Sequence, residues 1–145
     1  MAIGYGAELP LRVDNQDGPY ALLKTMTSVA SQNLKMLILT SPGERMMDNE
    51  FGVGIRNYLF WQYTPTTLSD IESRIRQQTS RYIPYIQIEE ISFNNKENIS
   101  VGASLADNFL SITIRFRVSS LNVGDVLTIP LSVSTSNNQA PTTYL

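Results

Sequence analysis

The sequence contains no cysteine and no histidine among its 145 residues. Thiolate nucleophiles, imidazole bases and most zinc sites depend on these two residue types, so a large part of enzyme chemistry is excluded. Without cysteine no disulfide can form, which fits a reducing compartment. Carboxylates, hydroxyls, lysine and tyrosine remain as candidate reactive groups. We therefore predict neither a metal nor a cofactor.

Long apolar runs and blocks of one charge are also scarce. The chain has 11 basic and 13 acidic residues, a net charge of −2, and no basic block. We therefore expect no nucleic acid and no membrane among its partners. The most continuous apolar stretch, Met36 to Leu39, is too short to span a bilayer, and the first residues do not resemble a signal peptide. These features predict a soluble protein that is made in the cytoplasm and binds other proteins.

The length and the apolar content of 42% suit a single domain with one core. Alternating apolar residues before residue 14 suggest an extended arm or edge strand over residues 1–18. Residues 134–145 are rich in Ser, Thr, Asn and Gln and predict a flexible polar tail. We expect residues 1–133 to form the domain.

Three segments carry helical spacing. An amphipathic helix is predicted to begin near Pro19 and to end before Pro42, because apolar residues recur at three- and four-residue steps: Leu23, Met26, Ala30, Leu34, Leu37 and Ile38. A short helix is expected over residues 55–63, with most of its aromatic rings in the core. The clearest helix has its start signal at Thr64-Pro65 or at Thr67 with Asp70, and it ends before Pro84.

Beyond Pro84 the apolar period falls to two, which predicts strands. The alternation changes phase near Glu89-Glu90, so we expect a β-bulge there. A long loop is predicted over residues 94–108, a regular strand over 110–118, and a turn over 122–125. The last strand contains Leu127, Ile129, Pro130, Leu131 and Val133, and its proline predicts an edge position. The predicted fold is α+β, with N-terminal helices on one face of a small antiparallel meander.

The stretch from Pro42 to Gly52 contains a Pro-Gly break followed by the adjacent charges of Glu44 and Arg45. In one interpretation, Arg45 caps the carbonyl end of the first helix and Glu44 favours the start of the next helix. In the other, a stiff turn displays the pair to a partner, because an arginine fork can bind a carboxylate at two points. Spacing alone favours the cap, and both interpretations can hold together.

Paired carboxylates are the remaining basis for catalysis, because glycoside cleavage needs only two of them. The candidates are Glu44, Asp48 and Glu50 in the turn, and Glu89 with Glu90 in a strand. Adjacent strand residues point to opposite faces, so the last pair does not share a site easily. No residue pattern predicts a serine nucleophile or a phosphate-binding loop. We therefore predict no catalytic residues and no enzyme activity.

These residues resemble a known family, the small baseplate wedge proteins of contractile-tailed phages, once labelled lysozyme-like, with relatives in type VI secretion and other contractile injection systems. The resemblance rests on a helix that ends at Leu39-Thr40, then Pro42-Gly43-Glu44-Arg45, then Glu50-Phe51-Gly52, and a terminal meander. It covers residues 18–133. Family members often carry proline where this chain has Asn49.

The resemblance implies a structural role without catalysis. By analogy, Gly43, Glu44, Arg45 and Phe51 would dock on the core formed by neighbouring wedge proteins. The meander would resemble the interlocking domain of the tail sheath, and its last strand, residues 127–133, would accept a sheath strand and start sheath polymerisation. Tube or hub proteins are further candidate partners. Multiple copies would stand in a sixfold ring of the virion baseplate, after assembly in the host cytoplasm.

Two other functions remain open at this stage. One is a carboxylate-dependent peptidoglycan hydrolase, which a peptidoglycan turnover assay would detect. The other is a free regulatory adaptor of the same fold, which would not sediment with assembled tails.

Overall fold

Three antiparallel strands form the main sheet of the structure. The computed structural model describes residues 4–14, 18–61, 64–95, 109–119 and 123–132. The strands are β3 (Ile86–Asn95), β4 (Phe109–Val118) and β5 (Val123–Ser132), and they lie in the order β3-β4-β5. The central strand β4 is the predicted regular strand, and β3 and β5 form the two edges.

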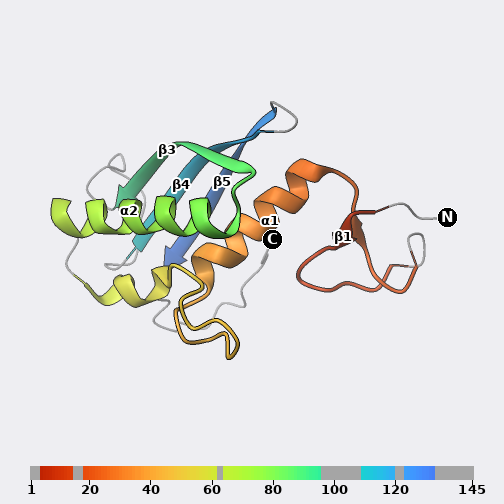
Figure 1. Cartoon of the computed structure of the whole chain (residues 1–145), viewed down its shortest axis with the longest axis horizontal. Helices are drawn as coiled ribbons and strands as arrows, with labels where there is room; N and C mark the ends of the chain where they lie inside the picture. Colours follow the sequence, from red (N-terminus) through yellow and green to blue (C-terminus); the bar gives the residue numbers. More distant parts are fainter. Residues whose placement is uncertain (1–3, 15–17, 62–63, 96–108, 120–122, 133–145) are drawn as a thin grey trace.

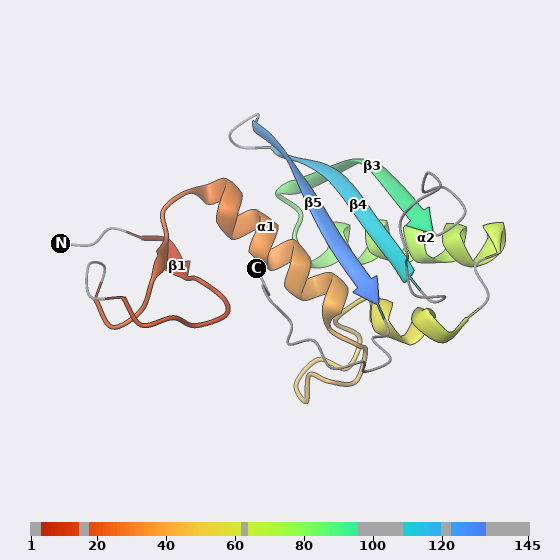
Figure 2. The same cartoon turned by 180° about the vertical axis from the view of Figure 1, so that it is seen from behind.

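Two helices cover one face of this sheet (Figures 1 and 2). Helix α1 (Met26–Leu39) packs against β5, and helix α2 (Pro65–Tyr82) packs against β3. The opposite face of the sheet carries polar side chains, including the ion pairs Arg115–Glu90 and Arg117–Glu89. The predicted α+β fold, with helices on one face of a meander, is confirmed.

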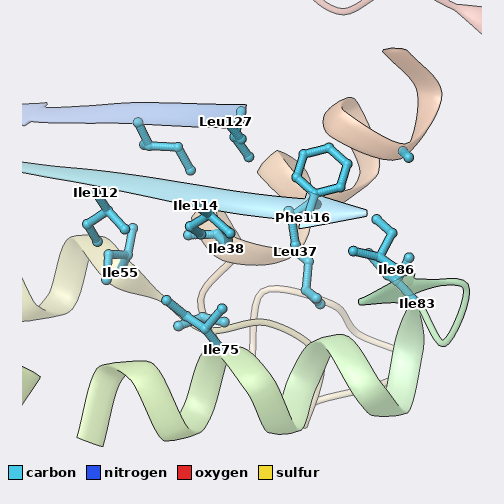
Figure 3. Close-up of a cluster of buried hydrophobic side chains, with 14 of the residues drawn as sticks. Leu37, Ile38, Ile55, Ile75, Ile83, Ile86, Ile112, Ile114, Phe116 and Leu127 are labelled. Carbon is cyan, nitrogen blue, oxygen red and sulfur yellow. The ribbon is translucent and has the colours of Figure 1, made fainter. Parts of the chain in front are cut away.

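The core lies between the sheet and the helices (Figure 3). Alternate residues of β4 point into it, as their period of two requires. They meet apolar residues from both helices and from the short 3₁₀ helix η1 (Ile55–Phe60). The fully buried side chains include Leu34, Leu37, Ile38, Ile55, Ile71, Ile75, Ile112, Ile114 and Phe116.

Helix α1 begins later than predicted. Leu23 has the right spacing for the helical stripe, but it lies with Leu22 in the short strand β2 (Leu22–Leu23). The helix starts after Thr25, whose backbone is extended and whose Oγ1 accepts the N–H of Ser28 at 3.1 Å. This cap stops the helix from extending back to Pro19.

The N-terminal arm is a small hairpin that lies at one end of the molecule (Figure 1). Its strand β1 (Gly6–Ala7) pairs with β2, whereas Leu9 to Val13, whose alternation suggested an extended arm or edge strand over residues 1–18, form no strand. Gln32 of α1 anchors the arm, since its Oε1 accepts the N–H of Leu9 at 2.9 Å and its Nε2 donates to the carbonyl of Ala7 at 3.2 Å. The arm is therefore folded back on α1.

The aromatic residues after Ile55 are more exposed than predicted. Ile55 and Leu59 of η1 are buried, but Phe60 and Trp61 are 77% and 60% exposed. A helix of this length buries only one stripe, and these two rings lie off it. Tyr63, which was predicted to belong to the same helix, lies outside the described residues.

Helix α2 has the predicted bounds. Thr64 Oγ1 accepts the N–H of Thr67 at 3.2 Å, Pro65 opens the first turn, and the helix ends at Tyr82, before Pro84. The predicted bulge is confirmed as a register shift between Ile88 and Glu90.

The predicted turn over 122–125 is wrong in part, because residues 123–125 already pair in β5. The proposed 94–108 loop also starts later, since β3 extends to Asn95. Residues 96–108, Val133 and the predicted tail over 134–145 lie outside the described residues.

Candidate functional site

The turn between α1 and η1, residues 41–52, leaves the end of α1 and returns to it. The N–H of Val53 donates to the carbonyl of Leu37 at 3.0 Å, and the N–H of Gly54 donates to the carbonyl of Thr40 at 2.9 Å. Backbone groups therefore satisfy these carbonyls at the end of α1. Arg45 is not needed as the helix cap that spacing alone favoured.

Glycine is required where the turn closes. Gly52 has a φ of +105°, and a Cβ at this position would lie 2.2 Å from the carbonyl oxygen of Thr40. Gly43 also has a positive φ, +92°, but its Cβ would meet open space. The N–H of Gly43 donates to the carbonyl of Asn49 at 3.0 Å.

Gln78 of α2 ties the turn to the body of the domain. Its Oε1 accepts the N–H of Gly52 at 3.1 Å, and its Nε2 donates to the carbonyl of Glu50 at 3.1 Å. The Gln78 side chain is buried, so these two bonds satisfy both ends of an amide that has left water. No sequence pattern predicts this role of Gln78, because a glutamine in a polar helix is usually solvated.

A row of stacked side chains extends from the turn to the C-terminal end of α2. The Arg45 guanidinium lies 4.0 Å from the centroid of the Phe51 ring. Phe51 packs edge-on against Tyr82 with a centroid distance of 4.9 Å, and Arg81 lies 5.2 Å from the Tyr82 ring. The structure thus brings together the predicted residues Arg45 and Phe51 with two residues that were not predicted.

Polar contacts support the same row. Arg81 Nη1 lies 2.6 Å from Glu50 Oε2, and the hydroxyl of Tyr82 donates to Asp48 Oδ1 at 3.1 Å. Desolvation, together with the hydrogen bond to Asp48, raises the pKa of Tyr82 above its ordinary value of 10.0. The phenol therefore stays neutral and continues to donate at neutral pH.

Glu44 and Arg45 have different surroundings although they are adjacent. Glu44 Oε2 accepts the N–H of Ser41 at 3.0 Å, so this carboxylate stabilises its own turn and does not reach η1. Within the residues that the structure describes, Arg45 has no salt bridge, and its contact is the face of Phe51. Its guanidinium N–H groups remain exposed at the surface.

Two methionines at the turn add an apolar surface that sequence reasoning missed. Met46 is 89% exposed and Met47 is 100% exposed. Exposed, flexible methionines are frequent at protein-binding surfaces. Two adjacent methionines among charged residues are a sequence signal for such an exposed apolar surface, because so polar a turn does not favour core positions.

The turn carboxylates are not arranged as an active site. Glu44 bonds to its own backbone, Asp48 to Tyr82, and Glu50 to Arg81. A groove of about 350 Å³ lies elsewhere, between α2 and β3, and its lining contains none of the three. In the described part of the chain, no group of three or more acidic side chains is placed to hold a metal ion.

No other described strand pairs with the outer edge of the last strand, β5. Backbone groups of an antiparallel strand point alternately toward and away from the neighbouring strand. The N–H of Val126 donates to its neighbour Asp125 Oδ1 at 2.8 Å, so Val126 points away from β4. The alternation gives Thr128 and Pro130 the same direction. Pro130 therefore lies at a position whose backbone nitrogen does not face β4, so its lack of an N–H removes no bond between the two strands.

The predicted edge residues therefore divide into two groups. Leu127 and Ile129 pair with Ile114 and Ile112, and their side chains are buried in the core. The backbone of Leu131 pairs with Leu110, and Pro130 pairs with Ser111 and belongs to the outward series. An added strand would meet the backbone of Val126, Thr128 and Pro130.

The opposite edge, at β3, is occupied by the chain itself. Arg76 Nη1 donates to the carbonyl of Ile88 at 3.1 Å, and the N–H of Ile86 donates to the carbonyl of Ile83 at 3.0 Å. Arg76 is fixed in turn by Glu72, with 2.9 Å between Nη2 and Oε1. Of the two edges, β5 is the more open.

The site and the fold define a small α+β module with an exposed turn at one end of α1 and a strand edge that no other described strand occupies. None of the described helices is long and apolar enough to cross a membrane. This is the geometry of a protein that binds other proteins through its surface.

Comparison with known proteins gives this module a family. A family model described as baseplate wedge protein gp25 matches residues 25–123. Baseplate wedge protein gp25 of Enterobacteria phage T4 is 32% identical over 101 residues, which cover 70% of this chain and 70% of that protein. The chain belongs to the gp25 family of baseplate wedge proteins. The resemblance described from the sequence is confirmed.

Solved structures show the same fold. A crystal structure from Geobacter sulfurreducens, of a protein named as a tail lysozyme, has a TM-score of 0.63 and 26% identity, and the match covers 81% of this chain and 99% of that one. A chain in the cryo-EM structure of the anti-feeding prophage baseplate has a TM-score of 0.62 and 22% identity, over 78% of this chain and 83% of that one. The second likeness concerns the fold alone.

Proposed function

We propose that this chain is a nonenzymatic structural subunit of a contractile tail baseplate. Its turn would dock on neighbouring wedge proteins, with tube or hub proteins as further neighbours, and its β5 edge would bind a strand of a tail sheath subunit. Several copies would stand in a sixfold ring of the particle, which is assembled in the host bacterial cytoplasm. Residues 1–133 would act as one wedge domain, with 134–145 as its tail.

The observation that carries the docking proposal is the state of Arg45. Its guanidinium is held over Phe51 at 4.0 Å, and Phe51 is fixed by Tyr82. An arginine held in one place loses less side-chain entropy on binding than a free one. Because it has no salt bridge in the described part of the chain, its planar fork is available to a carboxylate of a partner.

The exposed methionines indicate what surrounds this contact. Met46 and Met47 follow Arg45 directly and are almost fully exposed. An apolar surface on the partner would cover them and remove water from the arginine–carboxylate pair. Buried charge pairs are worth more than exposed pairs only when their polar groups are satisfied, so the partner is expected to present a carboxylate within an apolar surface.

The sheath contact is supported by the geometry of β5. Strand addition uses backbone groups that point away from the sheet, and β5 has them at Val126, Thr128 and Pro130. β3 is the weaker candidate, because Arg76 and Ile83 already occupy two of its outward groups. The sheath strand would therefore extend the sheet beside β5.

The test is a Thr128→Pro substitution in the particle. Thr128 points away from β4, so proline there removes an outward N–H without removing a bond between β4 and β5. We expect normal incorporation into baseplates and a loss of sheathed tails, counted by electron microscopy. Thr128→Val is the control, because it keeps the N–H. Normal sheaths on Thr128→Pro baseplates would show that the sheath does not pair with this edge.

The absence of catalysis is tested separately, because a solved neighbour is named as a tail lysozyme. We expect the purified protein to release no more peptidoglycan fragments than a heat-inactivated sample. Activity that disappears in a folded Glu44→Gln variant would overturn the nonenzymatic proposal. Protein found only free, and never in sedimented tails, would favour the regulatory adaptor.

A further inference from the structure

At Val126, Thr128 and Pro130, the outer edge of β5 has acceptors without most of the matching donors. The N–H of Val126 is held by Asp125 Oδ1 at 2.8 Å, and Pro130 has no N–H. Thr128, between them, is the one residue of these three that keeps both backbone groups available. The carbonyl groups of all three still point away from β4, because hydrogen-bonding direction alternates along the strand.

This pattern works against pairing with an identical edge. Two copies that join their β5 edges around a twofold axis run antiparallel, and a pairing centred on Thr128 places Val126 of each copy opposite Pro130 of the other. Pro130 cannot donate to the carbonyl of Val126, and Asp125 already holds the N–H that Pro130 would accept. Between Val126 and Pro130, only the reciprocal bonds of the two Thr128 residues remain.

A strand from another protein has no such restriction. If its residues facing Val126, Thr128 and Pro130 each carry a free N–H, each of the three carbonyl groups receives a donor. The same strand can accept the N–H of Thr128. An unrelated strand therefore forms more hydrogen bonds with this edge than a second copy does.

The β3 edge is protected in a different way from the β5 edge. On β3, the carbonyl of Ile83 accepts the outward N–H of Ile86, and Arg76 donates to the outward carbonyl of Ile88. One donor and one acceptor of that edge are therefore already bonded. On β5 the side chain of Asp125 and the ring of Pro130 remove donors alone. Such an edge stays available to a strand that supplies donors, whereas ordinary edge protection closes it to all partners.

We propose that Asp125 and Pro130 make the β5 edge self-excluding. They prevent edge-to-edge pairing of two copies and so reserve the edge for a strand of a different protein with its own free N–H groups. The reserved role rests on the proposed function, in which a sheath strand binds there. Self-exclusion itself is a property of this chain alone and can be measured without any other tail component.

The experiment compares association of purified variants by sedimentation velocity over a wide concentration range. Asp125→Ala with Pro130→Val restores donors at both positions, and we expect its dimer dissociation constant to be at least about tenfold lower than that of the wild type. Adding Thr128→Pro to this double variant should reverse the change. Circular dichroism checks that each variant is folded.

A matched control separates the hydrogen bond from the charge. Asp125→Asn removes the negative charge but keeps a side-chain oxygen that can hold the N–H of Val126. Combined with Pro130→Val, it should therefore associate less than the variant with Asp125→Ala. If both pairs associate equally, the Asp125 hydrogen bond has no part in the exclusion and the proposal is wrong for Asp125.

Three further results would overturn the proposal. The first is a folded Asp125→Ala, Pro130→Val variant that associates no more than the wild type. The second is association of this variant that persists with Thr128→Pro, and the third is a wild-type dimer that Thr128→Pro dissociates. None of these results depends on sheath assembly. Conversely, a sheath that ignores Thr128→Pro would overturn the proposed sheath contact and leave self-exclusion intact.

Discussion

The guanidinium group of Arg45 lies over the ring of Phe51, with 4.0 Å between its central carbon and the ring centroid. This contact joins two residues of the turn that lie six positions apart in the sequence, at 45 and 51. Phe51 in turn packs against Tyr82 at 4.9 Å, so the arginine is positioned by α2 as well as by the turn. The charge that would meet a partner is thus set on an ordered part of the domain.

Substitution of Arg45 by alanine tests its role in stability and its role in docking by two separate measurements. In Arg45→Ala, we expect the free energy of unfolding to fall by about 0.5–1 kcal/mol, the usual size of an exposed cation–π contact. Chemical denaturation measures that change. Incorporation into baseplates should be abolished in a complementation assay, because no other group supplies the planar fork.

The matched control is Arg56→Ala, which removes an exposed arginine from η1. It should leave incorporation unchanged. Arg45→Lys keeps the charge but lacks the fork, so it should restore incorporation only in part. Full incorporation of Arg45→Ala would show that docking does not pass through this residue.

The two glycines of the turn differ sharply in what they tolerate. Gly52→Ala places a Cβ 2.2 Å from the carbonyl oxygen of Thr40 and strains a φ of +105°. We expect a loss of more than about 2 kcal/mol, since backbone displacement adds to the cost of about 1–2 kcal/mol for a left-handed residue. Thermal unfolding measures it.

Gly43→Ala is the control for this prediction. Its φ of +92° carries a similar backbone cost, but the added Cβ meets open space. The difference between the two variants isolates the contact with Thr40. Equal losses would mean that the turn can move away from α1 at no cost.

Several features of the fold could be predicted because they depend on local chemistry. The alternation of apolar and polar residues in β4 predicts which face is buried, and Thr64-Pro65 predicts the start of α2. The phase change at Glu89-Glu90 predicts the bulge. Each of these signals lies within a few neighbouring residues.

Other features depend on contacts between distant residues and could not be predicted. Leu23 keeps helical spacing but lies in β2, because periodicity does not say where an element begins. Arg45 and Phe51 were predicted to belong to the site, but Gln78 and Tyr82 were not. Their roles exist only once α2 packs beside the turn, and one sequence carries no signal for that packing.

Loss of the Gln78 amide should loosen the turn. In Gln78→Leu the buried N–H of Gly52 has no acceptor, and an unsatisfied buried donor costs about 1–3 kcal/mol. We expect a loss of that size by denaturant unfolding, together with faster amide exchange at Gly52. Gln77→Leu is the matched control, since Gln77 is exposed on the same helix. An exchange rate at Gly52 equal to that of the wild type would contradict this role of Gln78.

The pKa of Tyr82 gives a prediction for alkaline pH. Desolvation and the hydrogen bond to Asp48 raise this pKa above 10.0 in the folded state, so folding favours the neutral phenol. The stabilisation is complete below the unfolded pKa near 10 and is lost as the pH rises through the raised folded value. We therefore expect the wild type to be more stable than Tyr82→Phe at pH 8, and the difference to shrink as the pH rises past 10 and through the raised folded pKa.

The measurement is denaturant unfolding of the wild type and of Tyr82→Phe at steps of pH from 8 to above 10. Tyr20→Phe is the control, because it removes a tyrosine hydroxyl from the N-terminal arm, where Tyr20 is 46% exposed. Asp48→Asn should lessen the difference at pH 8, because it replaces a charged acceptor by a neutral one while keeping an oxygen in place. A Tyr82→Phe variant whose stability follows that of the wild type at every pH would show that the hydroxyl contributes nothing to holding the turn against α2.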